Sequence, residues 1–261
     1  MTSNGTTGSL VGKAAIVTGA GSGLGRACGI ALAAEGAIVV VTELPGRIDL
    51  ANETVAQIEA AGGQVSAAAL DVLDLAGIDR CVANVAELHG RVNILVNNAG
   101  VNVRRDAFEV TEQDWDAVLD VNLKGVFFMA QAVGRRMRDQ SPAGGAVINM
   151  ASIMGLVGYY QRAAYCSSKA GVVNLTRVLA IEWAPHNIRV NAVCPTFVDT
   201  PLTKPMFEAQ PEFLDDILHR TLLGRLATPD DVGAAVVFLA GPGAAMIHGH
   251  ALPVDGGWTA M

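Results

Sequence analysis

An apolar run that passes through a glycine-rich turn into a helix-like stretch is the feature that most restricts the fold of this chain. Ala14 to Val17 are apolar, glycine then occupies every second position from Gly19 to Gly25, and a helix-like pattern continues to Ala34. Glycines in such a turn let backbone N–H groups approach a pyrophosphate at the positive end of the helix. The pattern predicts strand, turn and helix, and its candidate phosphate-binding residues are Gly19, Ser22, Gly23, Leu24 and Gly25.

Strand-like and helix-like segments alternate along the rest of the chain, which predicts an α/β fold with one doubly wound parallel sheet of the Rossmann type and helices on both faces. The expected strands are runs of Val, Ile and Ala without polar alternation, as helix-covered strands should be. They lie near Ala14, Ile38, Val65, Ile94, Val147, Ile188 and Ala251, and helical patterns include 48–61 and 114–137. With 261 residues and 51% hydrophobic content, one domain over 10–261 is the simplest expectation, preceded by a disordered tail over 1–9.

Glu43 ends the second expected strand, 18 residues after Gly25, where a carboxylate can bind the hydroxyls of an adenosine ribose. The same carboxylate would repel a 2′-phosphate, so the sequence favours NAD over NADP as cofactor. Arg47, four residues further on, is a candidate partner for such a phosphate. An exposed acid and an exposed base in a loop are the alternative interpretation.

A hydroxyl, a phenol and an ammonium follow one another at Ser152, Tyr165 and Lys169. Tyr165 and Lys169 are four residues apart in a helix-like segment and therefore share one helix face. A neighbouring cation lowers the pKa of a phenol, which makes Tyr165 a candidate general acid and base. Tyr and Lys at this spacing also occur by chance. The glycine turn near the start of the chain is what supports a catalytic interpretation of the pair.

Together these motifs resemble the classical short-chain dehydrogenase/reductase (SDR) family, and the resemblance runs from about Leu10 to the C-terminus. The other motifs that carry it appear in the family's order, as Asp71-Val72, Asn97-Asn98-Ala99-Gly100, Asn122 within Val121-Asn122-Leu123, and Val254-Asp255-Gly256-Gly257. The resemblance implies an NAD-dependent oxidoreductase that acts on CH–OH groups and interconverts a secondary alcohol and a ketone. It also implies cofactor contacts at Asp71, Val72, Asn98, Gly100, Tyr165, Lys169, Pro195, Val198 and Thr200.

The family's catalytic tetrad maps onto Asn122, Ser152, Tyr165 and Lys169. By this resemblance Tyr165 exchanges the substrate proton, Ser152 donates to the carbonyl oxygen, and Lys169 lowers the pKa of Tyr165 and holds the nicotinamide ribose. Asn122 would bind a water that connects Lys169 to solvent. The chain departs from the family at Thr196, where Gly usually follows Pro195, and a left-handed turn there would shift the contacts of Val198 and Thr200.

Two segments are candidates for substrate recognition. Arg104 and Arg105 lie close behind the Asn97–Gly100 motif and could hold a carboxylate, although a solvated basic loop is the alternative. The amphipathic stretch 200–220 is expected to close over the site as a lid. The Arg104-Arg105 loop, the stretches 111–116 and 152–154, and the ending 248–258 look similar to the branch of gluconate 5-dehydrogenase and 2-deoxy-gluconate 3-dehydrogenase. This similarity favours a sugar acid or another polar hydroxy compound as the small-molecule substrate. Reductases of 3-oxoacyl thioesters or of cyclic ketones and steroids remain alternatives, as does a non-catalytic NAD-binding regulator.

The formal net charge of −7 argues against nucleic acid or an anionic membrane as a partner. Four scattered cysteines without paired spacing, and an N-terminus without a signal sequence, predict free thiols and a cytoplasmic location.

His248 and His250 alternate on an expected strand, but without a third ligand they predict packing rather than a metal site. The family resemblance implies a homo-oligomer, a dimer or tetramer packed through the helices that hold Asn122 and Tyr165.

Overall fold

The computed structural model describes residues 8–200 and 203–260, and within them a seven-stranded parallel sheet forms the centre of the molecule. The strand order is β3-β2-β1-β4-β5-β6-β7. The strands are β1 Ala14–Val17, β2 Ile38–Glu43, β3 Gln64–Ala69, β4 Ile94–Asn97, β5 Gly145–Met150, β6 Ile188–Pro195 and β7 Ala251–Val254. The order reverses between β1 and β4, which is where open α/β sheets of this type place their ligands.

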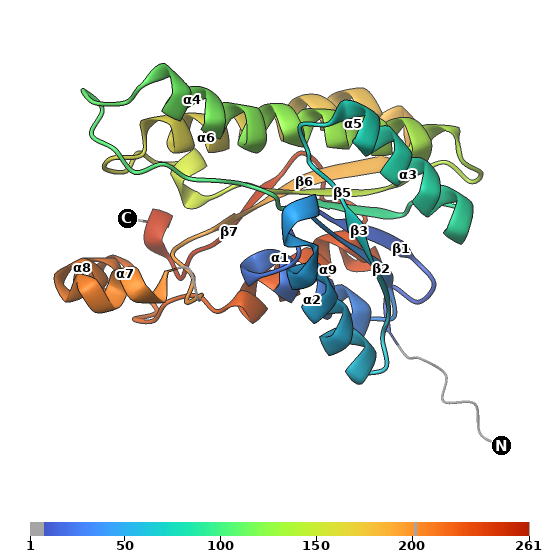
Figure 1. Cartoon of the computed structure of the whole chain (residues 1–261), viewed down its shortest axis with the longest axis horizontal. Coiled ribbons are helices and arrows are strands. Elements are labelled where there is room, and N and C mark those ends of the chain that lie inside the picture. Colours follow the sequence, from blue (N-terminus) through green and yellow to red (C-terminus); the bar gives the residue numbers. More distant parts are fainter. Residues whose placement is uncertain (1–7, 201–202, 261) are drawn as a thin grey trace.

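Helices cover both faces of the sheet, which confirms the predicted doubly wound architecture (Figure 1). On one face lie α1 Gly23–Ala34, α2 Ile48–Ala60 and α9 Pro229–Ala240. On the other face lie α3 Leu75–His89, α4 Glu112–Leu119, α5 Val126–Asp139 and α6 Ala163–Trp183. Two short helices, α7 Lys204–Ala209 and α8 Pro211–Arg220, project beyond the carboxyl end of β6.

The core forms because the central strands are apolar on both sides and the helices cover both. Ile16 faces one helix layer with Leu95 and Met129, whereas Ala15 and Val17 face the other. The edge strand β3 differs from the prediction, since exposed Gln64 and Ser66 alternate with half-buried residues. Polar alternation is tolerated there because the edge strand is less fully covered by the helix layers.

Helix boundaries follow local capping chemistry. The side chains of Thr228 and Asp231 form a capping box at the start of α9, with Pro229 in the first turn. The expected helix over 114–137 spans Glu112–Asp139 instead, because Thr111 caps it earlier and a π-helical turn, Asp120–Gly125, joins α4 to α5.

By length and composition the Glu112–Asp139 helix is apolar enough to span a membrane. Its apolar residues Val126, Met129 and Val133 are instead buried in the protein, so it is a core helix. The four cysteines are free thiols, as predicted, and three of them are buried.

The structure differs from the sequence prediction at His248 and His250, and it describes only part of the predicted N-terminal tail. His248 and His250 precede β7 in a turn around left-handed Gly249 rather than lying on a strand. The Nδ1 atom of His248 accepts a hydrogen bond from the backbone N–H of Val190, so this ring connects the turn before β7 to β6. Of the predicted tail, residues 1–7 lie outside the described residues, and the backbone N–H of Ser9 donates to the Glu35 carboxylate.

Candidate active site

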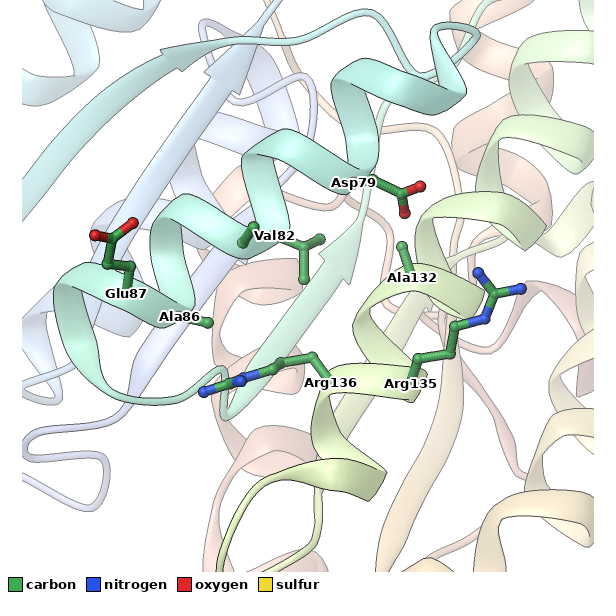
Figure 2. Close-up of a pocket in the computed structure, with 8 residues that line it drawn as sticks. Asp79, Val82, Ala86, Glu87, Ala132, Arg135 and Arg136 are labelled. Carbon is green, nitrogen blue, oxygen red and sulfur yellow. The ribbon is translucent and has the colours of Figure 1, made fainter.

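The predicted cofactor and catalytic residues gather at the carboxyl ends of β1, β2, β4, β5 and β6. This clustering follows from the parallel sheet, because loops after parallel strands emerge at one edge. A surface hollow between α3 and α5, lined by Asp79, Val82, Glu87 and Arg136 among others, shares no residue with this edge (Figure 2). It therefore plays no part in the site described below.

The glycine turn after β1 forms an open cradle at the start of α1. Gly23 has a left-handed φ of 54°, and a Cβ there would meet nothing within 4 Å. A Cβ on Gly25 would lie 2.3 Å from the Gly19 carbonyl oxygen, so only glycine permits this turn to close against the helix. The Ser22 side chain does not cap α1, which leaves backbone N–H groups at the helix start for an anion. The cradle fits a pyrophosphate.

Glu43 joins the end of β2 to this turn. Its Oε2 accepts from the Gly21 N–H at 3.3 Å and its Oε1 from the Leu44 N–H at 3.1 Å. The buried carboxylate thus lies beside the cradle, where an adenosine ribose would reach it. Arg47 is exposed in the following 3-10 turn. Arg26 is the cation nearest the turn, and it is bound to the Gly21 carbonyl, Thr54 and Glu53.

The other predicted cofactor residues line the same edge. The Asn98 amide donates to the carbonyls of Thr18 and Gly19, so its side chain braces the glycine turn. A Cβ on Gly100 would lie 3.7 Å from the Lys169 Nζ, which places Gly100 against this lysine. Asp71 accepts from the Leu73 N–H, and buried Val72 packs against the π-helical turn at Gly125.

Asn122 is fully buried in the π-helical turn, and its side-chain bonds are already committed. Oδ1 accepts from the Val101 N–H, while Nδ2 donates to the Val101 carbonyl and to Ser168 Oγ. The side chain therefore ties the loop after β4 to α6. Both Nδ2 protons of Asn122 are used in these bonds, whereas Oδ1 keeps a second lone pair that a water could bind.

Ser152, Tyr165 and Lys169 lie together between the end of β5 and the first turns of α6. Hydrogen bonding from Ser152 and the charge of Arg162 lower the pKa of Tyr165, but burial outweighs both and raises that pKa overall. The Lys169 Nζ lies 5.6 Å from the centroid of the Tyr165 ring and donates to the Met150 carbonyl at 2.7 Å. Burial lowers the pKa of Lys169 to about 8. The pKa of the phenol is thus raised and that of the ammonium lowered, and shifted pKa values cluster at functional sites.

The segment after β6 needs no glycine at position 196. The Thr196 N–H donates to the Val254 carbonyl, which continues the pairing of β6 with β7, and among the described non-glycine residues only Gln161 and Asn187 have left-handed φ. Pro195 ends β6 and Val198 is buried. Thr200 is held through Thr203, whose hydroxyl donates to the Val198 carbonyl. All three predicted residues remain at this edge of the sheet.

The two predicted substrate arginines have different surroundings. Arg105 forms an ion pair with Asp114, Nε to Oδ2 at 3.0 Å. Arg104 donates to the Gln161 side chain, and its Cζ lies 5.6 Å from the centroid of the Phe213 ring on α8. The structure therefore brings Arg104 to the α7–α8 segment and directs Arg105 toward α4. Residues 201–202 of the predicted lid lie outside the described residues.

Sequence reasoning missed an aromatic cluster and an arginine beside Tyr165. Buried Phe197 and Trp258 pack with Tyr159, Tyr165 and Phe213 under α8. Arg162 is buried immediately before α6, three positions before Tyr165. The available signal was the short distance in sequence between this cation and the phenol.

Comparisons with known proteins agree with this geometry. Residues 19–259 match the family model described as enoyl-(acyl carrier protein) reductase. The chain is 43% identical to D-threitol dehydrogenase of Mycolicibacterium smegmatis over 96% of this chain and 94% of that protein. It is 38% identical to 2-dehydro-3-deoxy-D-gluconate 5-dehydrogenase of Escherichia coli over 97% of each chain. A gluconate 5-dehydrogenase of Burkholderia cenocepacia, solved in complex with NADP and tartrate, superposes with a TM-score of 0.90 at 31% identity over 97% of each chain.

Proposed function

The chain belongs to the classical short-chain dehydrogenase/reductase family, and from that premise we propose that it is an NAD-dependent dehydrogenase of a small polar hydroxy compound, a sugar acid or a polyol. The single observation that carries the proposal is the group formed by Ser152, Tyr165 and Lys169 next to the glycine cradle. Family membership establishes an oxidoreductase acting on alcohol and ketone. The cofactor preference and the substrate are the proposal.

Each side chain of the group has a separate role. Tyr165 takes the hydroxyl proton when an alcohol is oxidised and returns it when a ketone is reduced. Ser152 donates to the same oxygen and stabilises the negative charge that develops on it. Lys169 supplies a buried positive charge near the phenol, and Asn122 holds the loop after β4 against α6. The nicotinamide, when bound, accepts or donates the hydride.

The preference for NAD rests on Glu43. Its carboxylate lies at the end of β2 beside the cradle, where a 2′-phosphate would bring a second negative charge into the same space. Relatives of this chain differ in cofactor, since one is an NAD-dependent glycerol dehydrogenase and another was solved with NADP. Residues near the ribose therefore decide the cofactor, and here the buried residue is an acid.

A polar substrate is supported by the relatives and by the site. The similar proteins include dehydrogenases of threitol, glycerol and 2-dehydro-3-deoxy-gluconate. They also include a 3-oxoacyl carrier-protein reductase of Thermotoga maritima, which is 39% identical. Arginines at the aromatic cluster, Arg104 and Arg162, supply donors for hydroxyl or carboxylate oxygens near Tyr165. This polarity favours a hydroxy compound over an acyl chain.

The proposal is tested by initial rates with purified protein, using NAD(H) and NADP(H) in parallel. The panel contains sugar acids, polyols, cyclic secondary alcohols and 3-oxoacyl thioesters. We expect turnover of sugar acids or polyols with NAD(H), and slower turnover with NADP(H). Tight NADH binding without turnover of any class would contradict the dehydrogenase and favour an NAD-binding regulator, while turnover of thioesters alone would contradict the substrate class.

A further inference from the structure

Arg162 carries a positive charge that the described part of the protein does not balance. Only 8% of the residue is exposed, yet its buried Nε has no hydrogen-bond partner. No hydrogen bond or ion pair joins its guanidinium to any residue in 8–200 or 203–260. A guanidinium has five N–H donors, and an enclosed N–H group without an acceptor is unfavourable. The two terminal nitrogens of Arg162 are not among the enclosed atoms and therefore remain accessible to a ligand.

The surroundings of Arg162 add no negative charge. Its Cζ lies 5.9 Å from the centroid of the Phe197 ring. The groups that act on its charge are Arg104, Tyr165, Tyr159 and Cys166, with no carboxylate among those described. Burial and the like charge of Arg104 both lower the pKa of Arg162. The nearby Arg220 shows the contrast, since it lies over Trp258 and is paired with Asp216.

Local backbone geometry holds Arg162 in this place. The preceding residue, Gln161, has a left-handed φ of 56°, which a side chain of this size rarely adopts. The Gln161 carbonyl accepts from the Arg105 N–H, and its amide oxygen accepts from Arg104. The left-handed Gln161 and its hydrogen bonds therefore fix the position of an arginine whose charge has no partner among the described residues. This indicates a ligand that carries the opposite charge.

The position of Arg162 indicates which ligand this is. Arg162 is the N-cap residue of α6, and its guanidinium lies over the Phe197 ring, in the same side-chain cluster as Tyr165. An anion on the guanidinium therefore lies within reach of a small molecule whose carbinol meets the phenol. The missing acceptor belongs to the substrate rather than to the distant end of the cofactor.

We propose that Arg162 binds a carboxylate of the substrate and makes this enzyme selective for hydroxy acids over neutral polyols. The inference rests on the proposed dehydrogenase function and narrows its substrate class. A planar guanidinium suits a carboxylate because it donates two parallel hydrogen bonds. Arg104 lies over the Phe213 ring, which packs against the Phe197 ring that Arg162 contacts. From there Arg104 can bind further oxygens of the same molecule.

The kinetic test compares gluconate with glucitol, which has the same carbon chain without the carboxylate. Arg162→Gln should raise KM for gluconate between about tenfold and a hundredfold, with a smaller effect on kcat and with KM for glucitol changed less than about threefold. Arg162→Lys keeps the charge without the planar fork and should give an intermediate KM. Arg138→Gln is the control, because exposed Arg138 pairs with Asp139 beyond the opposite end of the sheet. Equal effects on the acid and the polyol, or none, would overturn the proposal.

A binding test separates this proposal from the proposed function. Propionate and succinate should raise the Tm of the wild-type NADH complex, whereas butane-1,4-diol and sodium chloride at equal ionic strength should not. The shift should disappear in Arg162→Gln. If the shift is present and no substrate turns over, the dehydrogenase is contradicted and the anion site stands. If polyols turn over and no carboxylate shifts the wild-type Tm, the anion site is contradicted and the dehydrogenase stands.

Discussion

Burial shifts the pKa values of Tyr165 and Lys169 in opposite directions. Burial raises the pKa of Tyr165, with Ser152 and Arg162 opposing it, and lowers the pKa of Lys169 to about 8. Both shifts disfavour the charged form of each group, as expected in a site shielded from water. The sequence predicted the pair but assigned the lowering of the phenol pKa to Lys169, while in the structure Arg162 and Ser152 are the groups that lower it.

The raised pKa of Tyr165 predicts different pH dependence for the two directions of the reaction. Oxidation needs the deprotonated phenol, and because the pKa of Tyr165 is raised, kcat/KM for the alcohol should increase from about pH 6 to at least pH 9. Reduction needs the protonated phenol and should not increase over the same range. Initial rates in both directions measure this, and an oxidation rate that is flat or falls above about pH 7 would contradict the assignment.

At the scale of elements, features whose form depends on local chemistry were predicted from the sequence. Features that depend on contacts between residues distant in sequence were not. The glycine turn follows from backbone freedom and orphan N–H groups, and it is present. The π-helical turn at Asn122 depends on bonds to Val101 and Ser168, which are distant in sequence. Arg162 was missed for the same reason, since its burial results from packing against Phe197.

The link between β2 and the glycine turn predicts how the cofactor preference can be changed. Glu43→Ser removes the carboxylate that would repel a 2′-phosphate, so the ratio of kcat/KM for NADP to that for NAD should rise at least about tenfold. Exposed Glu59→Ser on α2 is the matched control and should leave the ratio unchanged. An unchanged ratio in Glu43→Ser would show that Glu43 does not select the cofactor.

For the whole molecule, the exposed face of α6 supports the expected homo-oligomer. Ile181 is 78% exposed and Val178, one turn earlier, is also exposed, although both are apolar. Exposed apolar side chains that gather on one helix face are typical of contacts with another protein. The opposite end of the same helix carries Tyr165 and Lys169, so association through α6 would leave the catalytic group intact.

This arrangement predicts that Ile181→Glu reduces the molecular mass in solution to that of a monomer or of a smaller oligomer, because a buried unpaired charge opposes association. Sedimentation velocity measures the mass. Val11→Glu places the same charge at an exposed apolar residue outside α6 and should leave the assembly unchanged. A monomeric wild-type protein, or an unchanged mass in Ile181→Glu, would contradict an α6 interface.

The most direct test of the whole account is the turnover of Tyr165→Phe with NAD and the best substrate of the panel. Loss of the phenol hydroxyl should lower kcat by about a hundredfold to ten-thousandfold, while the affinity for NADH, measured by fluorescence titration, stays within about threefold. Tyr160→Phe is the control, since Tyr160 is 74% exposed and five residues away in the chain. Retention of wild-type kcat in Tyr165→Phe would contradict the assignment of Tyr165 as the proton-transferring group.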